Sequence, residues 1–90
     1  MASDNFEKLR ELLSQNTSWP MLYMFKFIVP NTNDKVKQVA ILLPKEGVIS
    51  YKHTKNLNYV SITCKVLMHS VESIIEVNTK ATSISGVMML

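Results

Sequence analysis

Apolar and polar residues alternate along the segment YVSITCKVLM, residues 59–68, more regularly than elsewhere in this chain of 90 residues. Successive side chains of a β-strand point to opposite faces of a sheet, so a period of two separates them into two sets. The segment is therefore predicted to be a strand with one buried and one mostly polar face. The apolar set comprises Val60, Ile62, Cys64, Val66 and Met68.

Residues 21–29 are rich in aromatic and branched side chains and are predicted to form an earlier strand. One face of this strand holds Tyr23, Phe25, Phe27 and Val29, and the other holds Leu22, Met24, Lys26 and Ile28. The aromatic set fits beneath helices, so Lys26 is expected on the opposite face. Two further strands are predicted, at residues 47–54 and 87–90.

Three segments repeat apolar residues every three to four positions, which predicts amphipathic helices. Their apolar positions are Phe6, Leu9, Leu12 and Leu13 in residues 4–15; Val36, Val39, Ala40 and Leu43 in residues 34–43; and Val71, Ile74, Ile75, Asn78 and Ala81 after residue 70. Ser3 or Asp4 is the expected N-cap of the first helix, and Ser70 that of the third. Pro20 and Pro44 separate helices from the strands that follow.

The predicted order is a helix followed by β-α-β-β-α-β, which is the order of the α+β ferredoxin-like plait. In this fold two helices cover one face of a four-stranded antiparallel sheet. Right-handed crossovers place the first and third strands at its centre. One domain over residues 1–90 is predicted, with a helical extension at 1–16 and the βαββαβ core at 21–90.

Three strand segments, YMFKFIVP, NYVSITCKV and the closing GVMML, resemble the YbeD family of small bacterial proteins of unknown function. The turn Ser18-Trp19-Pro20 is similar to that of one branch of the family. The resemblance implies an ACT-like plait, similar to regulatory domains that pair side by side and bind small effectors. It implies an effector loop at Asn31, Thr32, Asn33 and Asp34, although this loop lacks the glycine that ACT domains usually have there.

Apolar residues make up 47% of the chain and charged residues 19%, which is typical of a globular protein. The net charge of +3 favours acidic partners but is small for a nucleic-acid-binding protein. The single cysteine, Cys64, excludes an internal disulfide and fits a reducing compartment. The longest apolar stretch, residues 21–30, is shorter than the roughly 20 residues of a membrane span. A soluble, cytoplasmic protein without membrane contact is expected.

Lys26 is expected to share the face away from the helices with Ser61, Thr63 and Lys65. It is either a surface lysine whose stem covers apolar neighbours, or a cation in a surface that binds an anion or a partner. A catalytic lysine would need burial or a partner residue that the sequence does not show. Because Leu22, Met24, Ile28 and Leu67 make this face partly apolar, either the N-terminal helix or a second subunit is expected to cover it.

Basic residues also surround the predicted hairpin, namely Lys45, Lys52, His53, Lys55 and Lys65. The plait is the topology of RNA-binding RRM domains, but the third strand has Tyr59 as its only ring and lacks their glycine-aromatic motif. Nucleic acid is therefore not the expected partner. His53, Cys64 and His69 lack the spacing of metal ligands, and Cys64 is expected in the core.

Neither a catalytic triad, a phosphate loop nor a dinucleotide fingerprint is present, so neither an enzyme nor a cofactor is expected. The predicted function is that of a regulatory or adaptor module that binds a protein partner, itself or a small effector. The predicted partner surface is Lys26, Ser61, Thr63 and Lys65. Two alternatives stay open: an RRM-like module with a basic sheet face, and an ACT-type domain that senses amino acids.

Overall fold

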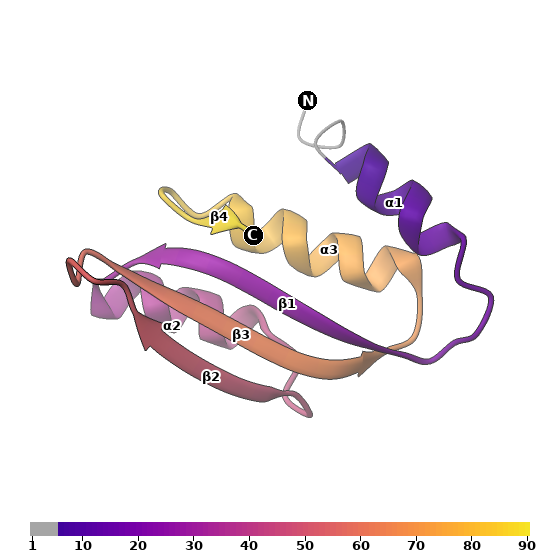
Figure 1. Cartoon of the computed structure of the whole chain (residues 1–90), viewed down its shortest axis with the longest axis horizontal. Coiled ribbons are helices and arrows are strands. Elements are labelled where there is room, and N and C mark those ends of the chain that lie inside the picture. Colours follow the sequence, from indigo (N-terminus) through magenta and orange to yellow (C-terminus); the bar gives the residue numbers. More distant parts are fainter. Residues whose placement is uncertain (1–5) are drawn as a thin grey trace.

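The computed structural model describes residues 6–90 and has an α+β fold in which helices lie on one side of a sheet (Figure 1). Its elements are α1 (Glu7–Ser14), β1 (Met21–Pro30), α2 (Asn33–Leu42), β2 (Val48–His53), β3 (Tyr59–Met68), α3 (Val71–Thr82) and β4 (Met88–Met89). After α1 the order is β-α-β-β-α-β, so the predicted ferredoxin-like plait is confirmed.

The four strands follow the order β2-β3-β1-β4, and all neighbours are antiparallel. The expected central position of the first and third strands is confirmed. β1 and β3 pair over ten residues, from Met21 opposite Met68 to Pro30 opposite Tyr59. β4 is shorter than expected, but the Leu90 N–H still donates a hydrogen bond to the Lys26 carbonyl at 2.9 Å.

The core lies between the sheet and its covering helices. Phe27 and Ile62 are opposite one another on β1 and β3, and both are fully buried. All five apolar residues predicted for one face of β3 are buried, which confirms the alternation seen in the sequence. On α3 the predicted inner side is also confirmed, including Asn78, which is only 1% exposed.

Side chains of the preceding residues cap two of the helices. The Ser70 hydroxyl accepts a hydrogen bond from the Ser73 N–H at 3.1 Å, as predicted for the start of α3. Thr32 does the same for α2, where its hydroxyl accepts from the Lys35 N–H at 3.3 Å. Ser3 and Asp4, the expected caps of α1, lie outside the described residues.

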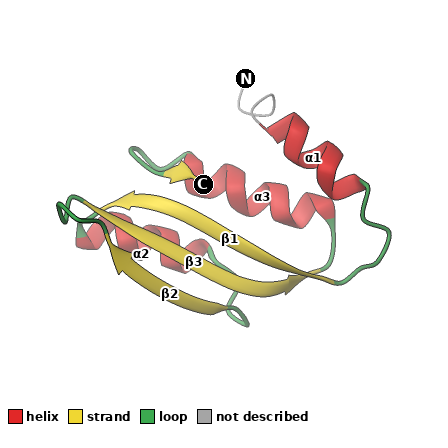
Figure 2. Ribbon diagram, viewed as in Figure 1, coloured by secondary structure: helices red, strands yellow, loops and turns green. Residues whose placement is uncertain are grey.

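The helix α1 packs against α3 and does not lie across the bare side of the sheet (Figure 2). Phe6 and Leu13 are buried, and the Arg10 guanidinium forms an ion pair with Glu72 of α3. Leu12, predicted on the buried stripe, is 65% exposed, because an eight-residue helix buries only the side that meets its neighbour. The sequence left two possible covers for the bare face of the sheet, the N-terminal helix and a second subunit. The prediction that the N-terminal helix covers it is wrong.

Candidate functional site

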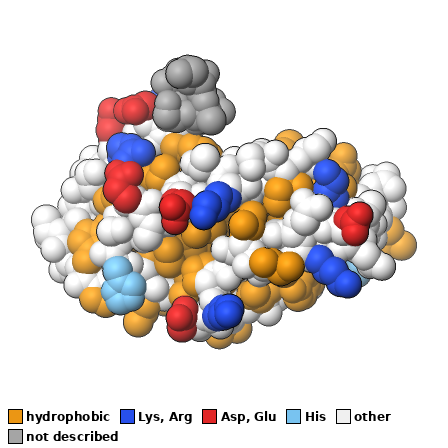
Figure 3. Space-filling view, turned by 180° about the vertical axis from the view of Figure 1, so that it is seen from behind, with side chains coloured by type: hydrophobic (Ala, Val, Ile, Leu, Met, Phe, Trp, Pro, Cys, Tyr) orange, Lys and Arg blue, Asp and Glu red, His pale blue; other side chains and the backbone are white. Residues whose placement is uncertain are grey.

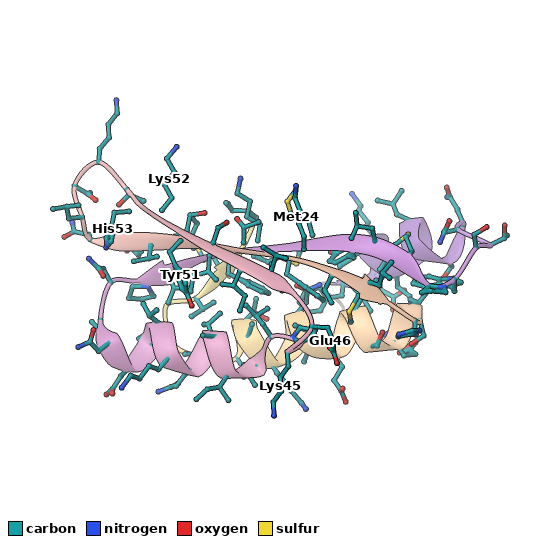
Figure 4. The ribbon with its side chains drawn as sticks, turned by 90° about the horizontal axis from the view of Figure 1, so that it is seen from below. Met24, Lys45, Glu46, Tyr51, Lys52 and His53 are labelled. Carbon is teal, nitrogen blue, oxygen red and sulfur yellow. The ribbon has the colours of Figure 1, made fainter. Side chains whose placement is uncertain are left out.

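The side of the sheet turned away from α2 and α3 is called the open face below. Residues directly opposite one another on paired strands point to the same side, so the register fixes its members. Met24 and Lys52 point away from the helices, whereas Tyr51 points toward α2 (Figure 4). The open face holds Leu22, Met24, Lys26, Ile28 and Pro30 of β1; Tyr59, Ser61, Thr63, Lys65 and Leu67 of β3; Val48, Ser50 and Lys52 of β2; and Met88 of β4.

The structure brings together the four residues predicted as a partner surface. Lys26 lies opposite Thr63, and the pairs formed by Ser61 and Lys65 flank this one along the same two strands. Lys26 and Lys65 are diagonal neighbours, about 7–8 Å apart at the backbone. Both lysines are exposed, and the neighbouring Ser61 and Thr63 are half-buried. The four side chains form one continuous patch in the middle of the open face.

Large apolar side chains surround this patch and stay in contact with water. Leu22 is 66% exposed, its register partner Leu67 is 55% exposed, and Met24 is 50% exposed. Val48 on one flanking strand and Met88 on the other are also more than half exposed. Contiguous apolar surface of this kind usually marks a place where a soluble protein binds something.

The charge on the open face has one sign. Lys26, Lys52 and Lys65 lie there, and the described strand positions that make up this face carry no Asp or Glu side chain. The opposite side of the molecule, which carries α2 and α3, displays acidic and basic side chains together (Figure 3). The basic cluster predicted around the hairpin is divided, because Lys45 points away from the sheet on the side of the helices (Figure 4).

The predicted effector loop borders a pocket of about 340 Å³. Asn31 and Asn33 line it, while Thr32 caps α2 and Asp34 belongs to the first turn of that helix. The Asn31 amide donates a hydrogen bond to the Leu57 carbonyl at 2.8 Å, which holds the loop against the β2–β3 hairpin. Tyr51 and His53 of β2 also line the pocket, together with Val36, Lys37 and Val60.

A larger pocket of about 600 Å³ lies at the far end of β3. It continues the open face, since Leu22, Lys65 and Leu67 line it beside His69 and Glu46. The sequence analysis had placed His69 at the end of the third strand without assigning it a surface. The open face therefore continues from the lysine patch toward the start of α3, and Glu46 places a carboxylate at this end.

A scan against protein-family models matches residues 14–90 to a family described as "Protein of unknown function (DUF493)". The chain belongs to this family. YbeD-like proteins are DUF493 proteins, so the resemblance carried by the strand sequences is confirmed. Searches of curated proteins and of solved structures each returned no match. The DUF493 match begins at the last residue of α1 and covers the whole sheet with its two covering helices.

Within residues 6–90, no helix is long and apolar enough to cross a membrane. In the same residues, no three His, Cys, Asp or Glu side chains lie together as metal ligands would. His53 and His69 lie near opposite ends of β3, one at the end of its neighbour β2 and the other just beyond Met68.

Cys64 of the DUF493 chain is fully buried on the helix-facing side of β3, as predicted. Burial raises the pKa of its thiol, because desolvation disfavours the thiolate. Gly47 lies so close that an added Cβ would be 2.4 Å from the Cys64 sulfur. The thiol is therefore enclosed and held in its neutral, unreactive form.

Cys64 is expected to react with a thiol-specific reagent slowly in the folded protein and rapidly in urea, because the thiolate is the reactive species. Because burial disfavours the thiolate only in the folded protein, the free energy of unfolding is highest below the pKa of the unfolded thiol and falls as pH rises from there through the raised folded-state pKa. Mass spectrometry of the labelled protein measures both rates, and this single cysteine makes the signal unambiguous. Labelling at the same rate in buffer and in urea would contradict the enclosure.

Proposed function

We propose that this DUF493 protein is a non-enzymatic regulatory or adaptor module of the cytoplasm that binds a protein partner on its open face. The observation that carries the proposal is the exposure of large apolar side chains on both central strands, beside the patch of Lys26, Ser61, Thr63 and Lys65. The helix α1, the expected cover within this chain, packs against α3 instead. A partner would remove this apolar surface from water, which favours association.

The open face supports a protein partner better than RNA. Sheet-based RNA binding uses two or three aromatic rings on which bases stack. Tyr59 is the one aromatic residue that the β-strand register places on the described open face, and it lies beside Pro30 at the end of the pairing. The other open-face positions of β1 and β3 carry aliphatic, hydroxyl, lysine or proline side chains, on which a base cannot stack as it does on an aromatic ring. The RRM-like alternative is thus the weaker one.

A small effector is the second candidate, and the pocket beside Asn31 and Asn33 favours it. Its lining offers two side-chain amides, the Tyr51 hydroxyl and the His53 ring as hydrogen-bonding groups. This supports an ACT-type site that takes an amino acid or another small polar molecule. However, the Thr32 hydroxyl already accepts a hydrogen bond from the first turn of α2, which leaves less of the helix start free for a ligand.

A photoreactive amino acid at position 24 is expected to crosslink to a second protein in cells of the organism that makes this protein. Met24 points outward from the centre of the open face (Figure 4). Ile41, which is 81% exposed on α2, is the matched control position on the side of the helices. Crosslinked bands on a gel, identified by mass spectrometry, would report the partner and the face that it meets.

Crosslinks of a given protein from position 24 but not from position 41 are the expected result. Equal yields from both positions would mean that the contact is not specific to the open face. Crosslinks from position 41 alone would contradict the proposed binding face. Light scattering on the purified protein, run in parallel, would show whether the crosslinked partner is a second copy of the chain.

A further inference from the structure

Apolar side chains predominate on one half of the open face, and two of its three lysines lie on the other half. The register gives three rows across the sheet: Val48, Lys65 and Met24; Ser50, Thr63 and Lys26; and Lys52, Ser61, Ile28 and Met88. The half formed by β1 and β4 is mostly apolar, and Leu22 with its neighbour Leu67 extends it. The half formed by β2 and β3 holds the hydroxyls and two of the three lysines, together with Val48 and Leu67, and the third lysine, Lys26, lies on β1. A partner that fits this face is therefore mainly apolar along one side and carries most of its charge along the other.

An occupant of this face has to satisfy its own backbone hydrogen bonds. The backbone N–H and C=O groups of β1 and β3 point within the plane of the sheet and not toward the open face. β3 has a paired strand on both sides, and β4 pairs with β1 at Phe27 and Ile28. An extended segment lying on the face would leave buried backbone groups unpaired, at a substantial free-energy cost. A helix has no such deficit, and helices already cover the other face of this sheet. A third layer made by a partner's helix would complete the arrangement.

The charge of the open face decides what kind of helix fits. A second copy docked through the same face would bring Lys26, Lys52 and Lys65 against three identical lysines, which like-charge repulsion disfavours. An amphipathic helix flanked by carboxylates meets the lysines with opposite charge and the apolar half with its own apolar stripe.

We infer that the open face binds an acidic amphipathic helix of a partner protein, and this inference rests on the proposed function above. The apolar stripe of that helix packs along Leu22, Met24 and Ile28 of β1. Its carboxylates face Lys65 and Lys52, and a further carboxylate at the edge of its stripe meets Lys26, which lies between Met24 and Ile28 on β1. A helix of about 18 residues is about 27 Å long, which approaches the roughly 33 Å of a ten-residue strand such as β1.

Two synthetic helical peptides of about 18 residues test this inference. Both carry the same leucine stripe, and one is flanked by glutamates where the other has glutamines. Fluorescence anisotropy is expected to show about tenfold tighter binding of the glutamate peptide at low salt, from a few exposed ion pairs. The difference should shrink at high salt, because screening weakens such pairs. Backbone amide shifts in NMR spectra are expected along β1 and β3.

Lysine variants locate the effect within the protein. Lys26→Gln with Lys65→Gln is expected to bring the affinity for the glutamate peptide close to that for the glutamine peptide. The matched control, Lys45→Gln with Lys80→Gln, removes the same charge from exposed positions outside the open face and should change little. A loss of the same size in the control would mean that only net charge matters and would overturn the inference.

The remaining outcomes separate this inference from the proposed function. Equal affinity for the two peptides, with shifts on the open face, would overturn the acidic chemistry and leave that face as a protein-binding surface. Shifts confined to α2 and α3 would overturn both. Failure of both peptides to bind would overturn the inference that an acidic helix binds here, and crosslinking at position 24 would still test the proposed function. Polyuridine, titrated in the same way, tests RNA as the occupant. If polyuridine binds the open face more tightly than the glutamate peptide, the inference is also overturned.

Discussion

Replacing Phe27 by alanine is expected to lower the free energy of unfolding by about 3–5 kcal/mol. Replacing its neighbour Lys26 by alanine is expected to change it by less than about 0.5 kcal/mol. Phe27 is fully buried opposite Ile62 in the centre of the core, so its removal leaves a cavity. Lys26 is one residue away on the open face, where truncation removes an exposed side chain.

Urea denaturation followed by tryptophan fluorescence measures both changes. Trp19 is the only tryptophan and packs half-buried against the core, so its emission reports unfolding. Domains of this size are stable by about 5–15 kcal/mol, and Phe27→Ala would remove much of that. If this variant does not fold, Phe27→Leu provides a milder test with a loss of the same sign. Similar losses for the changes at positions 26 and 27 would contradict the assignment of the two faces of β1.

The regular parts of the fold could be predicted because their patterns follow directly from local geometry. The predicted bounds of β3 match the structure. The alternation of apolar and polar residues continues for as long as the strand does, so its ends mark the ends of the strand. The inner side of α3 was also predicted, down to the polar Asn78. The short β4 could not be bounded in the same way. Its length depends on how far β1 offers it a partner, and Leu90 still bonds to β1 beyond the assigned strand.

In the candidate site too, residues placed by the pattern along one strand could be predicted, whereas those placed by packing between distant segments could not. Alternation along two strands was enough to place Lys26, Ser61, Thr63 and Lys65 on one face. The position of α1 was not predictable, because an apolar stripe shows that a helix buries one side but not which neighbour it meets. Tyr51 and His53 were missed beside the Asn31 loop for a similar reason. Only the register of β2 brings them there, although alternation along that strand places both on the side of the helices.

Asn78→Leu is expected to raise the free energy of unfolding by about 1–3 kcal/mol. Asn78 is 1% exposed on the inner side of α3, and neither polar atom of its side chain has a hydrogen-bond partner within residues 6–90. Burying an unsatisfied amide is costly, and leucine has a similar size without polar atoms. The urea midpoint measures the change, and Asn78→Asp, which can place a charge in the same site, should be strongly destabilising.

The outcome at Asn78 also separates stability from binding. Because the residue lies on the side of the helices, Asn78→Leu should leave the affinity for the glutamate peptide unchanged while stability rises. A loss of stability would instead mean that ordered water satisfies the amide in solution, since buried water typically bonds to such groups. A change in peptide affinity would mean that the core below the sheet and the open face above it are coupled. In that case the lysine variants would have to be compared at equal stability.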